Sequence, residues 1–157
     1  DIEVITQKVE EVKMLFDKKA YFSKKQFDYE YETYRELWKK VYDWRCYWYS
    51  TVTELTTQID NETLKKKKNE AEERFKTFYA ELEYATPFVC KEVLIVLEKI
   101  RNIYNSSCLS LAIYSPNDPQ NIDLFQNLIE SLNQVDFILF KSGELSEAMK
   151  KRIEEFE

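Results

Sequence analysis

The chain has 157 residues, of which 44% are hydrophobic and 15% aromatic, with one glycine and three prolines. This composition argues against a disordered chain and against an all-β fold with its many turns, so we expect one domain of long helices. The net charge of −6 disfavours electrostatic binding to nucleic acid, and we predict no nucleic-acid partner.

The first 55 residues are predicted to form one long helix. In the second half, an aromatic-rich stripe repeats every three or four residues and consists of Phe27, Tyr31, Tyr34, Trp38, Val41, Arg45, Trp48, Val52 and Leu55. The stripe starts earlier as Ile2, Ile5, Val9, Val12, Phe16, Ala20 and Ser23, with one extra four-residue step near Phe16. A helix of about 50 residues measures roughly 75 to 85 Å, more than a compact domain of this size covers. We expect residues 1–25 to project as a helix extension; the alternatives are a bend near Ser23 or packing on another chain.

Three further long helices and a short one are predicted after this helix. The second begins near Glu62, the third follows Thr86-Pro87 as N-cap and first helical residue, and the fourth begins near Pro119 with Asp118 as its cap. A short last helix starts near Glu144, after Ser142-Gly143. The predicted fold is therefore all-α: an antiparallel up-and-down helical bundle of four main helices plus a short C-terminal helix, in a single domain over 1–157.

The residues needed for common catalytic and metal sites are missing. The chain has no histidine, which excludes Ser-His-Asp catalysis and histidine-dependent metal motifs, and its single glycine, Gly143, excludes glycine-rich phosphate loops. The cysteines Cys46, Cys90 and Cys108 are widely spaced and are interpreted as reduced, small buried hydrophobes. We therefore predict no catalytic residue, no metal site and no cofactor, and the protein is not expected to be an enzyme.

Two segments carry a resemblance to known sequences. FDYEYETYRELWKKVYD is followed by a polar break, a Lys/Glu-rich helix and TPFVCKEVLIVLEKI. Over Gln26 to Ile103 this pattern resembles a loosely defined group of uncharacterised bacterial proteins in which a membrane anchor at the N-terminus leads into a cytosolic helical domain. The resemblance implies a cytoplasmic protein tethered to the inner face of the membrane through a segment upstream of Asp1. It supplies no functional residue to carry over.

Two surfaces are candidates for protein contacts. Trp44, Arg45, Tyr47 and Trp48 belong to a cluster of the residue types that dominate interface energetics, with Tyr47 expected at the surface. In this interpretation Arg45 can also stack on a neighbouring ring. The alternative places the aromatic rings in the core, with the tyrosine hydroxyls in contact with water. Val9 and Phe16, in the projecting part of the first helix, are candidates for self-association.

Two groups of charged residues could form binding sites or simply be solvent-exposed helix surface. Lys65, Lys66, Lys67 and Lys68 could contact an anionic surface such as lipid headgroups, or form a solvated face paired with Glu70 and Glu72 one turn later. The carboxylates Glu70, Glu72, Glu73, Glu81 and Glu83 are interpreted as solvated helix surface. A hydrolase or nuclease would require them to converge on a metal.

The preferred function is a non-enzymatic helical interaction or oligomerisation module with a protein partner or a second copy. The alternative is a small-molecule or lipid-sensing bundle with its ligand between the aromatic helix and the helix that contains VLIVL. A cavity lined by Trp38, Trp44 or Trp48 would favour that alternative.

Overall fold

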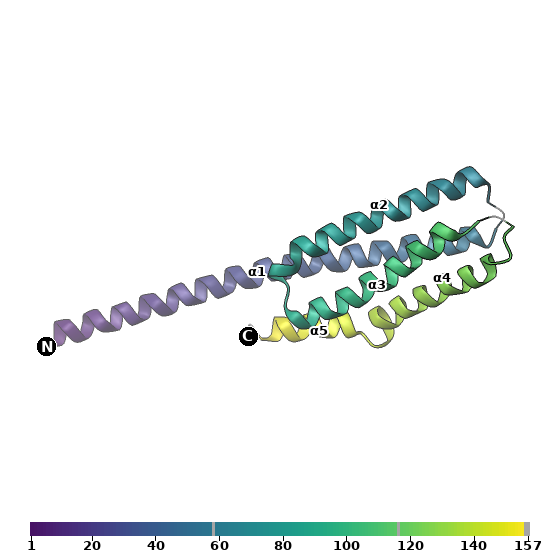
Figure 1. Ribbon diagram of the computed structural model, residues 1–157. Helices are drawn as coiled ribbons and strands as arrows, with labels where there is room; N and C mark the ends of the chain where they lie inside the picture. The colour runs from purple at the N-terminus through teal and green to yellow at the C-terminus, as the bar shows by residue number, and fades with distance from the viewer. Residues whose placement is uncertain (58, 116, 156–157) are drawn as a thin grey trace.

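The protein is an all-α bundle in which the first four helices run antiparallel, as predicted (Figure 1). The computed structural model describes residues 1–57, 59–115 and 117–155, with the backbone alone for 19–22. The helices are α1 (Ile2–Leu55), α2 (Asn61–Ala85), α3 (Lys91–Ile113), α4 (Asn121–Asp136) and α5 (Glu144–Glu154). A 3₁₀ turn, η1 (Thr86–Phe88), precedes α3, and a π-helical segment, η2 (Phe137–Lys141), ends α4.

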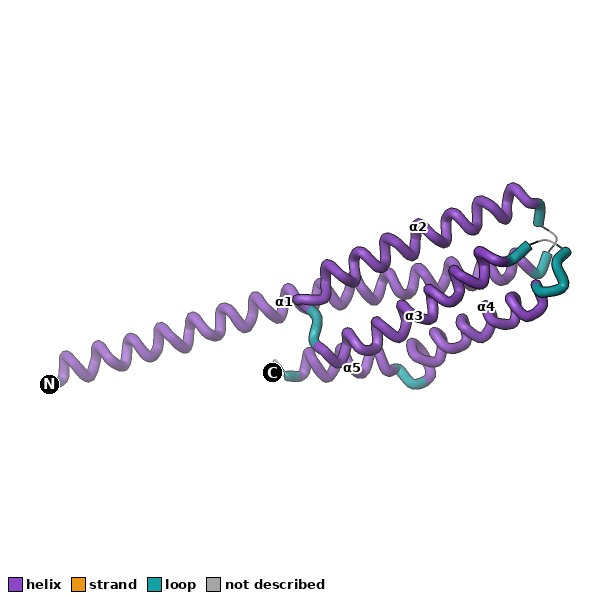
Figure 2. The backbone as a smooth tube through the Cα atoms, viewed as in Figure 1, coloured by secondary structure: helices purple, strands orange, loops and turns teal. Residues whose placement is uncertain are grey.

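Helix α1 is continuous over 54 residues and extends far beyond the other helices (Figure 2). No glycine or proline interrupts it, and the Asp1 carboxylate accepts a hydrogen bond from the Glu3 backbone N–H at 3.2 Å. The first residue with a buried side chain in the described part of α1 is Glu30. The N-terminal half of α1 therefore lies outside the bundle and the C-terminal half inside it.

Helix α3 supplies the centre of the core. Val93, Leu97, Ile100 and Leu111 have no exposed surface, in agreement with the apolar circumference of this segment. Tyr104 of α3 stacks on Trp44 of α1 with ring centroids 4.3 Å apart, and its hydroxyl donates a hydrogen bond to the Val41 carbonyl at 3.0 Å. The aromatic half of α1 is thus fixed directly against the central helix.

The predicted starts of the third and fourth helices are wrong by a few residues. Thr86 does not cap α3, because its hydroxyl donates to the Leu82 carbonyl and closes the end of α2, and Val89 is extended before α3 begins. Asp118 accepts from the Gln120 N–H inside the preceding turn, so α4 begins at Asn121. In both places the capping residue serves the neighbouring turn instead of the predicted helix.

The junction between α4 and α5 contains the only glycine. The Ser142 N–H donates to the Phe137 carbonyl at 2.8 Å, which closes the wide π turn. Gly143 then adopts a left-handed conformation with φ 63°. After this turn, α5 continues towards the same end of the bundle as α4 and packs beside α1 and α3 (Figure 1).

No helix in the described ranges combines the length and the apolar character that crossing a membrane requires.

Candidate interaction surface

The free end of α1 presents an uncovered apolar stripe. Its members are Ile2, Ile5, Val9, Val12 and Phe16, with exposed fractions between 51% and 82%. We call these five residues the free stripe. Tyr34, Val41, Trp48 and Leu55 continue the same spacing within the bundle and are buried. The same side of α1 is therefore exposed to solvent along the N-terminal half of the helix and buried in the core of the bundle along the C-terminal half.

The free stripe has the spacing of a coiled-coil seam. The steps between its residues alternate between three and four, which keeps the side chains on one line along the helix. Nothing in the described part of the chain covers this line. Val4, Met14 and Leu15 are also exposed, so the apolar surface is wider than the seam itself.

A buried ionic network marks the point where α1 enters the bundle. The Glu30 carboxylate is 7% exposed and receives two hydrogen bonds from the Arg152 guanidinium of α5, both at 2.9 Å. It also accepts the Tyr34 hydroxyl at 2.9 Å, and the Tyr34 oxygen accepts the Cys90 backbone N–H at 3.2 Å. These contacts fasten α5 and the start of α3 to one turn of α1.

The charges in this network are mutually stabilising. Hydrogen bonds from Arg152 hold the pKa of Glu30 below its usual value, although burial acts in the opposite direction. Burial raises the pKa of Tyr34, which therefore remains a neutral donor to Glu30. The network keeps a carboxylate ionised beside the core where the free half of α1 begins.

Sequence reasoning did not find Glu30 or Arg152. The available signal was that Glu30 lies four residues before Tyr34, next to the inward stripe, where a carboxylate needs a partner. The partner lies 122 residues further along the chain. Helical spacing cannot identify a contact at that separation.

Trp44, Tyr47 and Trp48 belong to the core and do not form an exposed interaction surface, which corrects that interpretation of the cluster. The expectation that Tyr47 stays at the surface is also wrong, because it is 7% exposed and donates to the Lys67 carbonyl at 2.9 Å. Burial raises the pKa of its hydroxyl to about 12. The indole Nε1 of Trp44 donates to the Arg74 carbonyl at 3.1 Å, so both rings join α1 to α2.

Arg45 is the half-buried member of the cluster and joins α1 to α4. Its guanidinium donates twice to Asp136, at 2.6 and 3.3 Å. It also lies over the rings of Phe140 and Tyr49, at 5.1 and 5.8 Å from their centroids, which confirms the predicted stacking on a neighbouring ring. Arg45 therefore joins α1 to the C-terminal end of α4 and to the η2 segment.

The four lysines at the start of α2 separate into two pairs. Lys65 and Lys66 are exposed, whereas Lys67 pairs with Glu54 at 3.0 Å and Lys68 donates to the carbonyls of Ala112 and Tyr114. The predicted pairing with Glu70 and Glu72 is wrong, because these carboxylates pair with Arg74 and Lys76 instead. Only Lys65 and Lys66 remain candidates for contact with an anionic surface.

Lys68 caps the end of α3, and its removal is expected to be measurable. Replacing Lys68 by Ala leaves the final carbonyls of α3 without this charged donor, at the negative end of the helix dipole. We expect the free energy of unfolding to fall by about 1 kcal/mol. Lys65→Ala is the matched control and should change stability by less than about 0.5 kcal/mol, as measured by urea unfolding. Equal effects of the two substitutions would contradict the capping role.

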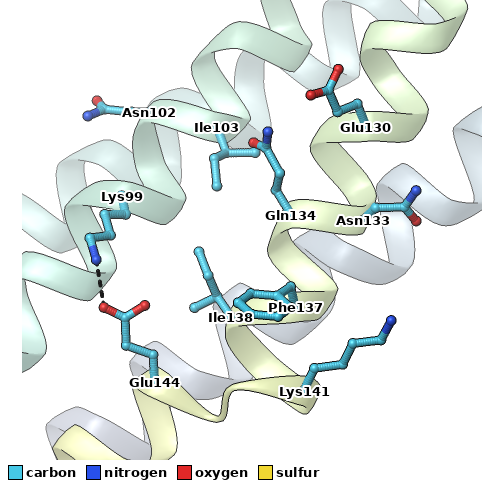
Figure 3. Close-up of a pocket in the computed structure, with 10 residues that line it drawn as sticks. All are labelled: Lys99, Asn102, Ile103, Glu130, Asn133, Gln134, Phe137, Ile138, Lys141 and Glu144. Carbon is cyan, nitrogen blue, oxygen red and sulfur yellow. Dashed lines mark hydrogen bonds and ion pairs between the residues drawn. The ribbon is translucent and has the colours of Figure 1, made fainter.

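A surface groove of about 750 Å³ runs between α3, the end of α4 and α5 (Figure 3). Ile103, Phe137 and Ile138 line it with apolar surface, and the Lys99–Glu144 ion pair, 2.6 Å long, closes one end. The expected ligand position between the aromatic helix and α3 is filled, because Trp44 and Tyr104 stack there. A smaller hollow of about 230 Å³ reaches the edge of Trp44, but it lies between α1 and α2.

The cysteines and carboxylates show no reactive arrangement within the described residues. Cys46 is exposed, which corrects its interpretation as a buried residue, while Cys90 and Cys108 are partly buried. Burial raises the pKa of the Cys108 thiol to about 12, which keeps it protonated. In the ranges that the structure covers, no three His, Cys, Asp or Glu side chains are grouped so that they could bind a metal ion.

Comparison of the chain with protein-family models, with curated proteins and with solved structures gives no match.

Proposed function

We propose that this chain is a non-enzymatic self-association module in which the free end of α1 pairs with a second copy. The observation that carries the proposal is the free stripe, an apolar seam without a cover in the described chain. The bundle then acts as a rigid body at the base of the pairing helix. The Glu30–Arg152 network fixes the direction in which that helix leaves the bundle.

The exposed helix needs a partner for energetic reasons. Most helical stability in proteins comes from packing of an apolar face, and helix propensity alone leaves short isolated helices marginal in water. Val4, Ile5, Val9 and Val12 are β-branched residues, which lose side-chain freedom in a helix. Burial of the free stripe against another helix supplies the missing packing, so association and full helix formation are coupled.

A second copy is the partner that the charges favour. Residues 1–17 contain five carboxylates and two lysines, whereas residues 18–26 contain four lysines and no carboxylate. An acidic segment and a basic segment therefore lie next to each other on the same pairing helix. Another copy of this helix offers each segment a partner of opposite charge.

Val9→Glu combined with Phe16→Glu is expected to abolish self-association. Both residues lie in the seam, where two carboxylates per chain would be desolvated without a partner in the dimer. Light scattering after size exclusion, at matched concentrations, should give a dimer for the parent chain and a monomer for this variant. An unchanged mass would contradict the proposal.

The matched control is Gln7→Glu combined with Met14→Glu. These substitutions also add two carboxylates to exposed turns of the same helix segment, but at positions two residues before Val9 and Phe16, away from the seam. The control should retain the dimer mass. Circular dichroism of both variants should show an intact bundle, since neither pair touches the core.

Attachment to a membrane through a segment upstream of Asp1 stays a prediction.

A further inference from the structure

We infer that the two copies pair antiparallel along the free half of α1, so that the two bundles lie at opposite ends of the dimer. This inference rests on the proposed function and specifies its geometry. Two observations carry it independently: the position of the bundle on α1, and the order of side chains along the free segment.

The bundle disfavours a parallel pair. The face that carries the free stripe continues as Tyr34, Val41 and Trp48, and this continuation is buried by the other helices. In a parallel pair in register, the straight α1 of the partner would follow the same face into the space of α3, whose Tyr104 contacts Val41. In an antiparallel pair, the partner's helix begins at its own N-terminus and need not enter the bundle.

The length of the free segment fits full antiparallel overlap. With the centre of the pair between Val12 and Lys13, Ile2 lies at the height of Ser23 in the second copy, just before the bundle. The paired region then covers 2–23, about 32 Å at 1.5 Å per residue. In the same register Val9 lies at the height of Phe16, so each layer there combines a small side chain with a large one.

The charges disfavour a parallel pair in register. In a parallel coiled coil in register, Lys8 and Lys13 occupy the flanking positions that face each other between the two chains, and two lysines repel.

Spin-label distances distinguish the two orientations. Labels are attached to Glu3→Cys or Lys24→Cys, both at exposed positions, with the exposed Cys46 replaced by Ser. Antiparallel pairing predicts axial separations of about 29 Å between the two copies of residue 3 and about 35 Å between those of residue 24. A mixture of the two labelled chains should add a short distance of about 10 Å, the usual spacing of packed helices.

The mass of each labelled protein is measured on the same samples, and the Cys46→Ser chain is the labelling blank. A dimer with long distances within each variant and a short distance in the mixture supports antiparallel pairing. A dimer with distances of about 10 Å at both sites overturns the antiparallel inference and leaves self-association intact. A monomer at all concentrations overturns both the orientation and the proposed function.

Discussion

Replacing Trp44 by alanine is expected to lower the free energy of unfolding by about 3 to 5 kcal/mol, the largest effect of any single substitution considered for this chain. The indole of Trp44 is 3% exposed. It stacks on Tyr104 of α3, packs edge-on against Phe75 of α2 and lies beside Trp48 of its own helix. Truncation creates a cavity and removes the hydrogen bond to Arg74. Both losses act on the same contact between α1 and the rest of the bundle.

Tyr84→Ala is the control for this substitution. Tyr84 is an aromatic residue of α2 with 80% of its surface exposed, so its removal should change stability by less than about 0.5 kcal/mol. Urea unfolding followed by circular dichroism measures both variants. Similar midpoints for Trp44→Ala and the parent chain would mean that Trp44 does not fill the core as described.

The second large effect is expected at the buried ion pair. Arg152→Ala leaves the Glu30 carboxylate without its main partner, and Glu30 is only 7% exposed to water. We therefore expect the free energy of unfolding to fall by about 3 kcal/mol. Combining Arg152→Ala with Glu30→Gln should cost less than the sum of the single substitutions, because the uncompensated charge is gone. Arg35→Ala removes an exposed ion pair with Glu32 and is the control, with an expected change near zero. Strict additivity at positions 30 and 152 would contradict the coupling.

The same pair predicts a dependence of stability on pH. The pKa of Glu30 is lower in the folded chain than its ordinary value of 4.5. Its stabilising contribution is therefore fully present above the unfolded pKa and is lost as the pH falls through the folded pKa. The difference in unfolding free energy between the parent chain and Glu30→Gln should shrink as the solution is acidified below about pH 4.5.

Helical periodicity was sufficient to predict the bundle. In α1, the alternation of three- and four-residue steps identified the stripe of which Tyr34, Val41 and Trp48 are the buried members. In α3, the run from Val93 to Leu97 was apolar over most of the circumference, and both end residues are fully buried. These features depend on local spacing, which the sequence contains directly.

Contacts between distant segments could not be predicted in the same way. Arg45 was expected to stack on a ring, but its ion pair with Asp136 joins residues 91 positions apart. Residue types alone do not distinguish an interface from a core: the sequence of the aromatic cluster is compatible with both, and Trp48 is in the core with 3% exposure. Lys68 likewise found its acceptors at the end of α3 and not one turn away.

Sedimentation equilibrium of the parent chain, from low micromolar to millimolar concentration, measures whether a second copy covers the free stripe. If a second copy covers the stripe, the weight-average mass rises with concentration from the chain mass of 19.0 kDa towards twice that value. Val9→Glu/Phe16→Glu should remain at the chain mass over the same range. A parent chain that stays monomeric at millimolar concentration would contradict self-association through the free stripe.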